Sequence, residues 1–247
     1  MSRPLTLFNP SRILAAALFA LFAFATLGLT AGAHAQSVDL SARTKQTRIA
    51  VIGDSVANDL GRGFQDLFEN NPRIEIVKQT QFATGLVRTD YYDWNGTVRK
   101  FLKTHNPDVI LVVIGGNDRQ AIRVNGHRYE PFEKGWVADY ERRVARFMKN
   151  FKGERAQVYW VSLPPVRSEK LTAAFREMNR IYERQAKRHG FHYLSVWNRF
   201  LTKGAYSSFG QSLEGVRRQI RKDDGMHFTE AGRVLFASYV ANAIGLR

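Results

Sequence analysis

The 247-residue sequence contains no cysteine, which excludes disulfide bonds and cysteine-based metal or redox chemistry. Stability must therefore come from the burial of apolar side chains. Acidic residues are also scarce, since 22 Asp and Glu stand against 37 Lys and Arg, for a net charge of +15. Such a charge attracts anionic partners such as acidic glycans, lipid headgroups or nucleic acid, although a soluble basic surface explains it equally well.

Long apolar runs are almost absent, and the one that exists, Ile13 to Leu29, lies close to the N-terminus. Arg3 and Arg12 precede this run and a small-x-small site ends at Ala35, which together predict a signal peptide over residues 1–35 that is cleaved after Ala35. The alternative is an uncleaved anchor, because the run is near the lower length limit for a membrane span. No later stretch of the sequence is long and apolar enough to span a bilayer. From the predicted signal peptide we expect an exported protein, with the periplasm as its compartment.

Beyond the signal peptide, the sequence divides into a polar tether, residues 36–47, and a single domain, residues 48–247. Within the domain, short apolar runs alternate with segments that repeat apolar residues at helical spacing. Expected strands cover residues 49–52, 74–77, 108–114, 158–163 and 193–196, and expected helices cover residues 56–68, 97–105, 136–151, 169–189 and 229–244. The continuous Val, Ile and Leu content of the third strand is typical of a strand buried on both faces. The alternation predicts an α/β fold with a central parallel sheet.

Two stretches interrupt this alternation. Residues 119–135 contain an Asn-Gly pair at 125–126, which predicts a hairpin turn. Residues 203–222 are polar and contain several closely spaced basic side chains. Both stretches follow expected strands, and loops at such positions carry function in α/β folds, so we expect them to face a substrate.

Three polar motifs stand out because ligands of open α/β sheets bind at the carboxyl ends of the strands. The Gly-Asp-Ser motif at 53–55 ends the first strand where a helix begins, and helix N-terminal amides stabilise negative charge. The Gly-Gly-Asn-Asp motif at 115–118 ends the third strand, and its asparagine amide can donate to an oxyanion. The Asp-Gly-Met-His motif at 224–227 precedes the last expected helix.

The spacing of the third motif suits catalysis by a serine. A neutral histidine such as His227 removes a serine proton only when an acceptor holds its other ring nitrogen. Asp224, three residues earlier across a turn that contains Gly225, can reach that nitrogen. Each motif alone has an ordinary structural explanation, with Ser55 as a helix N-cap and Asn117 as a turn residue. Together, and in this order, the motifs indicate a catalytic site.

These motifs resemble the conserved blocks of the SGNH hydrolase superfamily and span nearly all of the domain in the same order. The matching residues are Gly-Asp-Ser at 53–55, Gly85, Gly-x-Asn-Asp at 115–118 and Asp-x-x-His at 224–227. Val56 stands where the GDSL motif has leucine. The run at 116–120 resembles an exported bacterial branch of the superfamily that was long known only as a domain of unknown function.

The resemblance implies a flavodoxin-like three-layer sandwich and the activity of a serine hydrolase. It implies that Ser55 is the nucleophile, that His227 is the general base and then the general acid, and that Asp224 orients the histidine. The amides of Ser55 and Gly85 and the side chain of Asn117 would form the oxyanion hole. No metal and no organic cofactor is expected.

Arg88, Tyr92 and Arg119 lie beside the expected site loops and are candidate substrate-binding residues, with a solvated or structural role as the alternative. We expect an esterase that cleaves acyl esters through an acyl-enzyme, acting on O-acyl groups of envelope glycans or on another small ester, anionic or neutral. An acyltransferase would use the same triad, and a non-enzymatic glycan-binding module is a further alternative. Nucleic acid is not an expected partner, because the chain is predicted to be exported and its basic residues are spread along the sequence.

Overall fold

The computed structural model describes residues 46–246. The predicted signal peptide and almost all of the predicted tether lie outside these residues. Among the helices that the structure does describe, none has the length and apolar content that a membrane span requires.

The domain is built on a five-stranded sheet in which every strand is parallel to its neighbours. Its strands are β1 (Thr47–Gly53), β2 (Ile74–Thr80), β3 (Val109–Val113), β6 (Gln157–Val161) and β7 (His192–Leu194), in the order β2-β1-β3-β6-β7. This is the flavodoxin-like order, and the strand order switches direction between β1 and β3. In folds with this strand order, ligands bind beyond the carboxyl ends of the strands at the switch, which here are β1 and β3.

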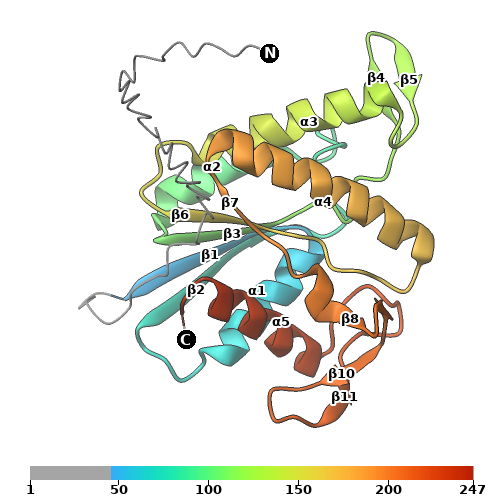
Figure 1. Cartoon of the computed structure of the whole chain (residues 1–247). Coiled ribbons are helices and arrows are strands. Elements are labelled where there is room, and N and C mark those ends of the chain that lie inside the picture. The colour runs from blue at the N-terminus through green and yellow to red at the C-terminus, as the bar shows by residue number, and fades with distance from the viewer. Residues whose placement is uncertain (1–45, 247) are drawn as a thin grey trace, which may run out of the picture. The chain divides into compact units, whose positions relative to one another are not determined.

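Helices cover both faces of the sheet, which gives the predicted three-layer sandwich (Figure 1). One layer holds α1 (Ser55–Leu67) and α5 (Glu230–Ala243), and the other holds α2 (Trp94–His105), α3 (Lys134–Met148) and α4 (Glu169–His189). All five residues of β3 are buried, which explains their continuous apolar content.

Helix ends follow local capping more closely than apolar periodicity. The second helix begins at Trp94 rather than at the expected residue 97, because the Asp93 side chain accepts a hydrogen bond from the Gly96 amide, 3.0 Å away. The last expected turn of α3 is a separate 3-10 helix, Lys149–Phe151. In contrast, α4 has the predicted bounds, and Gly190 ends it in the left-handed conformation.

Both interruptions form small hairpins. Strands β4 (Ile122–Val124) and β5 (His127–Tyr129) enclose the predicted Asn-Gly turn, whose two residues both have positive φ. The polar stretch at 203–222 takes part in two further hairpins that the sequence did not predict. They pair β8 (Leu201–Thr202) with β9 (Ala205–Tyr206), and β10 (Phe209–Gln211) with β11 (Arg217–Gln219), after the 3-10 helix Trp197–Phe200. Such short strands leave too little alternation to detect from sequence.

Candidate active site

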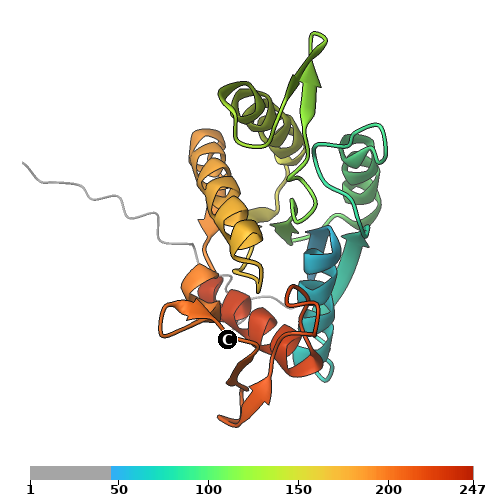
Figure 2. The ribbon, with the colours of Figure 1, turned by 90° about the vertical axis from the view of Figure 1, so that its right-hand side faces the viewer.

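Ser55, His227 and Asp224 form one hydrogen-bonded chain at the carboxyl edge of the sheet, the edge that faces the viewer in Figure 2. His227 Nε2 lies 2.8 Å from Ser55 Oγ, and His227 Nδ1 lies 2.7 Å from Asp224 Oδ2. Because an ionised carboxylate only accepts, Nδ1 carries the proton and Nε2 is left to accept from the serine hydroxyl. Ser55 begins α1 and the other two precede α5, so folding brings together residues 172 positions apart.

The Asp224 carboxylate is held ionised by its own loop. Its second oxygen, Oδ1, accepts from the main-chain amides of Met226 (2.8 Å) and His227 (2.9 Å). Partial burial acts to raise the pKa of Asp224, but the hydrogen bonds from His227 and Met226 outweigh it and lower the pKa to about 2. Gly225 has a φ of +71°, a conformation that favours glycine within this tight turn.

Asp54, the residue before Ser55, links the carboxyl ends of β1 and β3. Its carboxylate is fully buried and accepts from the amides of Val56 (2.9 Å), Gly115 (2.9 Å) and Gly116 (2.7 Å). Burial outweighs these hydrogen bonds and raises the pKa of Asp54 to about 6. Asp54 therefore caps α1 and also fixes the loop after β3 against the loop after β1.

Asn117 lies over the loop that follows β2. Its side-chain amide Nδ2 donates to the Thr84 carbonyl oxygen at 2.9 Å. Thr84 is itself held, because its hydroxyl donates to the Gln81 carbonyl at 2.7 Å and accepts from the buried indole of Trp94 at 3.1 Å. Since an amide nitrogen carries two protons, one N–H of Asn117 remains for a ligand.

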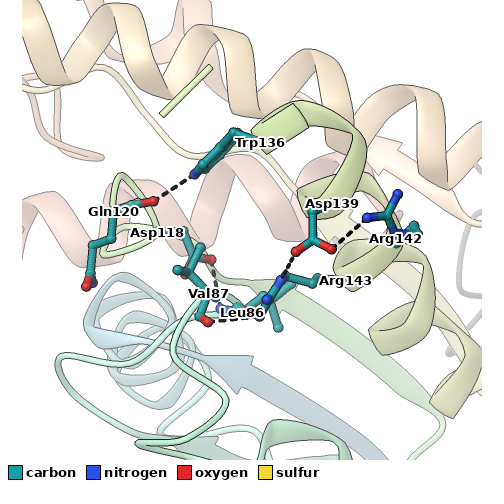
Figure 3. Close-up of polar contacts among 8 residues, drawn as sticks. All are labelled: Leu86, Val87, Asp118, Gln120, Trp136, Asp139, Arg142 and Arg143. Carbon is teal, nitrogen blue, oxygen red and sulfur yellow. Dashed lines mark hydrogen bonds and ion pairs between the residues drawn. The ribbon is translucent and has the colours of Figure 1, made fainter. Parts of the chain in front are cut away.

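Gly85 sits where the loop after β2 meets a buried carboxylate. Asp118 accepts hydrogen bonds from the amides of Leu86 and Val87, each at 2.8 Å (Figure 3). It also accepts one from the Tyr140 hydroxyl at 2.8 Å. A Cβ at position 85 would lie only 2.1 Å from Asp118 Oδ1, so the backbone requires glycine here. Within residues 46–246, the Gly85 amide donates to no group.

Helix α3 supports the same loop from the outside (Figure 3). Arg143 donates to the carbonyl oxygens of Leu86 (3.2 Å) and Val87 (2.9 Å) and forms an ion pair with Asp139. The indole of Trp136 donates to the Gln120 carbonyl at 2.7 Å, which ties the loop after β3 to the same helix. Two site loops are thus fixed by one helix.

Arg221 supports the loop that carries His227. Its side chain is fully buried and donates to the carbonyl oxygens of Met226 (2.6 Å) and Pro165 (2.7 Å), while its guanidinium lies 3.7 Å from the ring centre of Phe228. Burial lowers the pKa of Arg221 to about 9. Asp59 on α1 accepts from the Phe228 amide at 2.9 Å, which ties the same loop to the helix that begins with Ser55.

The three predicted substrate-binding residues border this network without contacting the triad. Arg88 forms an exposed ion pair with Asp90 at 2.7 Å. The Tyr92 hydroxyl accepts a hydrogen bond from the side-chain amide of Gln79 at 3.2 Å, and the Tyr92 ring packs edge-on against Trp94. Arg119 is exposed, and it lies between Asp118 and Gln120 in the loop after β3. Within the described residues, none of the three makes a polar contact with Ser55 or His227.

Sequence reasoning missed most of the residues that support the site. Asp54 and Asp118 are adjacent to predicted site residues, yet only their buried positions reveal them as acceptors for amides of other loops. Arg143 and Arg221 carry no local signal, because charged residues are common throughout this chain. Each becomes recognisable only through carbonyl groups that are distant in sequence.

Comparisons with known proteins agree with this architecture. The family model described as protein of unknown function (DUF459) matches residues 48–243, whereas no curated protein matches the sequence. A GDSL-like lipase from Bacteroides thetaiotaomicron has a similar structure, with 14% identity and a TM-score of 0.54 over 80% of this chain and 87% of its own. A catalytic mutant of an acetylxylan esterase from Geobacillus stearothermophilus has 15% identity and a TM-score of 0.56, covering 81% and 95% of the two chains.

An alpha/beta hydrolase from the metagenome of Lake Arreo is similar to the same degree, with 17% identity and a TM-score of 0.57 over 81% of this chain and 96% of its own. At these identities the likeness shows a shared fold, which is the fold that the family resemblance implied. The family match covers most of the described residues and all of the site. The chain therefore belongs to the DUF459 family, and it shares its fold with the GDSL-like lipase described above.

Proposed function

We propose that the protein is a serine esterase that hydrolyses small acyl esters with Ser55, His227 and Asp224 as its catalytic triad. The observation that carries this proposal is the continuous chain of hydrogen bonds from Ser55 Oγ through the imidazole to Asp224. The lowered pKa of Asp224 supports it, because an ionised partner stabilises the imidazolium that forms during attack.

Acylation begins when Ser55 Oγ attacks the ester carbonyl carbon and its proton passes to His227 Nε2. The negative charge on the carbonyl oxygen is stabilised by the amides of Ser55 and Gly85 and by Asn117 Nδ2. The Ser55 amide lies in the first turn of α1, where the helix offers no carbonyl acceptor, so it is free to donate. When the tetrahedral intermediate collapses, the bond to the alcohol oxygen breaks and His227 gives that oxygen its proton.

Deacylation repeats the sequence with water. His227 takes a proton from a water molecule, the resulting hydroxide attacks the acyl-enzyme, and the acid leaves as Ser55 regains its proton. The protons therefore move between Ser55, His227, the leaving alcohol and the attacking water, while Asp224 stays ionised. The steps require no metal and no organic cofactor.

The proposed substrate is an O-acylated glycan of the cell envelope. Three observations support it: the predicted signal peptide, the net charge of +15, and the similar fold of an acetylxylan esterase. The predicted export to the periplasm agrees with a substrate in the cell envelope. The positive charge favours glycans that carry acidic groups.

Comparison of the purified protein with its Ser55→Ala variant tests the triad. We expect p-nitrophenyl acetate hydrolysis to fall by up to about six orders of magnitude in the variant, and also in His227→Ala. Circular dichroism confirms that each variant is folded. If Ser55→Ala keeps the wild-type rate, the esterase proposal is wrong.

The same assay separates hydrolysis from acyl transfer, which would use the same residues. A hydrolase releases acetate steadily from an acetylated glycan in water alone. A dedicated acyltransferase would instead give one burst of alcohol, followed by turnover only when an acceptor glycan is added.

A further inference from the structure

A cleft separates the start of α4 from the β8–β9 hairpin. Its volume is about 390 Å³, and its lining includes Pro165, Arg167, Thr172, Arg176, Trp197 and Tyr206. A space of this size is within the range that binds small organic ligands. None of these residues belongs to the proposed triad or oxyanion hole, so the cleft has no role in the mechanism described above.

The cleft presents two guanidinium groups that lack acidic partners. The Arg176 guanidinium lies over the Trp197 ring at 5.3 Å from its centre, which holds it in place. Arg167 donates to the Asp223 carbonyl at 2.5 Å and to Ser208 Oγ at 3.3 Å. Within residues 46–246 neither arginine forms an ion pair with a carboxylate, and Glu169 is the only acidic residue in the lining. The cleft therefore favours an anionic group.

Arg167, which lines the cleft, is hydrogen-bonded to the loop that carries His227. The Arg167 amide donates to the Gly225 carbonyl at 2.9 Å, and a Cβ on Gly225 would touch Arg167 Cβ. In the proposed mechanism His227 protonates the departing alcohol, so the alcohol part of the ester lies on the His227 side. In the same mechanism the carbonyl oxygen accepts hydrogen bonds from Gly85 and Asn117, which belong to the loops after β2 and β3. The cleft thus adjoins the side where the alcohol part of a substrate lies.

We infer that this cleft is a subsite for an acidic glycan, and that Arg167 and Arg176 bind a carboxylate or phosphate on a sugar near the O-acyl group. The inference rests on the proposed function, because it takes the glycan to be the alcohol part of the ester. It makes Arg176 a specificity-determining residue that acts on substrate binding and not on bond cleavage.

The Arg176→Gln variant tests the subsite without disturbing the reacting groups. The Arg176 side chain is exposed, and its guanidinium packs on the ring of Trp197, which is not one of the triad residues. With an O-acetylated oligouronate or an O-acetylated sugar phosphate, we expect KM to rise about tenfold for at least one substrate while kcat is unchanged. The two substrates distinguish a carboxylate from a phosphate ligand. With a neutral O-acetylated xylo-oligosaccharide and with p-nitrophenyl acetate, we expect no change.

Arg188→Gln is the matched control. It removes one positive charge from an exposed position on the same helix, twelve residues or about 18 Å further along. We expect this variant to behave like the wild type with every substrate. If both variants raise KM equally, or if Arg176→Gln leaves KM unchanged for both acidic substrates, the cleft is not the subsite.

A binding measurement separates this inference from the proposed function. Calorimetry on the Ser55→Ala protein records oligouronate and sugar-phosphate binding without any turnover. We expect the double variant Ser55→Ala/Arg176→Gln to bind the preferred ligand about tenfold more weakly than Ser55→Ala alone. Equal binding would overturn the subsite even if the esterase is active, whereas weaker binding would support it even if no ester is hydrolysed.

Discussion

At the scale of single residues, two carboxylates beside Ser55 have pKa values shifted in opposite directions. Asp54 is fully buried, and burial outweighs three amide donors, so its pKa rises to about 6. Asp224 is only partly buried, so burial raises its pKa less than its hydrogen bonds lower it, and the result is about 2. Asp224 is therefore ionised at neutral pH, as a partner of His227 has to be, while Asp54 titrates under mildly acidic conditions.

The raised pKa of Asp54 predicts a pH-dependent contribution to stability. The folded state binds this proton more tightly than the unfolded chain, whose value is near 3.8. Stability from Asp54 is therefore highest below pH 3.8 and decreases as the pH rises through 6, by about 1 kcal/mol between pH 5 and pH 7. The Asp54→Asn variant is less stable than the wild type at both pH values, because one amide loses its acceptor. We expect its free energy of unfolding, measured by urea unfolding, to be the same at pH 5 and at pH 7.

Asp90→Asn serves as the control for that measurement. Asp90 is exposed, and its hydrogen bond with Arg88 lowers its pKa, so it is ionised at both pH 5 and pH 7. Its replacement should leave the pH dependence of the wild type unchanged. An Asp54→Asn variant with the full wild-type difference would show that another group titrates instead.

Asn117 is expected to act on the rate through one hydrogen bond. Its Nδ2 already donates to Thr84, and its second N–H is free for the oxyanion. We predict that Asn117→Ala lowers kcat for p-nitrophenyl acetate by roughly a hundredfold to a thousandfold, the usual effect of losing one oxyanion donor. An unchanged kcat in a folded variant would remove Asn117 from the oxyanion hole.

At the scale of elements, the loop before α5 depends on an arginine that belongs to the segment after β11. Arg221 donates to the carbonyl groups of Met226 and Pro165, and so links the His227 loop to the loop after β6. In Arg221→Met both carbonyls lose their donor, and we expect the free energy of unfolding to fall by about 3 kcal/mol. We also expect kcat to fall with little change in KM, because His227 is held less firmly.

Urea unfolding and steady-state kinetics at a temperature where the variant is folded measure both effects. Arg218→Met is the matched control, since Arg218 is exposed on β11 and its replacement should change neither quantity. A folded Arg221→Met protein with the wild-type kcat would show that Arg221 supports the fold alone. Restoration of kcat but not of stability by Arg221→Lys would separate the two roles.

At the scale of the whole molecule, the excess of positive charge should assist acidic substrates. The net charge of +15, to which Arg3 and Arg12 of the predicted signal peptide contribute two, creates a field that salt screens, with a Debye length of about 10 Å at 0.1 M. We predict that raising the salt concentration from about 0.02 M to about 0.5 M increases KM for an O-acetylated oligouronate several-fold. For p-nitrophenyl acetate, which is neutral, KM should be constant, and a constant KM for both would mean that the field has no part in binding.

The sequence by itself determined the parts of this protein that depend on neighbouring residues. The alternation of apolar runs and helical spacing predicted the five strands of the parallel sheet and its five helices, because burial imposes these periods locally. The Asp-Gly-Met-His spacing predicted the contact between Asp224 and His227, since three residues and one glycine turn are enough to form it. Motif order predicted that Ser55 would join them.

The tertiary structure alone decided which distant groups surround those residues. Asp54 reaches amides 61 and 62 residues away, and Arg221 reaches a carbonyl 56 residues away. The cleft beside Arg167 and Arg176 exists only because the start of α4 packs near a short hairpin. Local sequence carries no record of these pairings, because they depend on how the strands and helices pack. Their effects on pKa, stability and substrate binding therefore become predictable only once the folded arrangement is known.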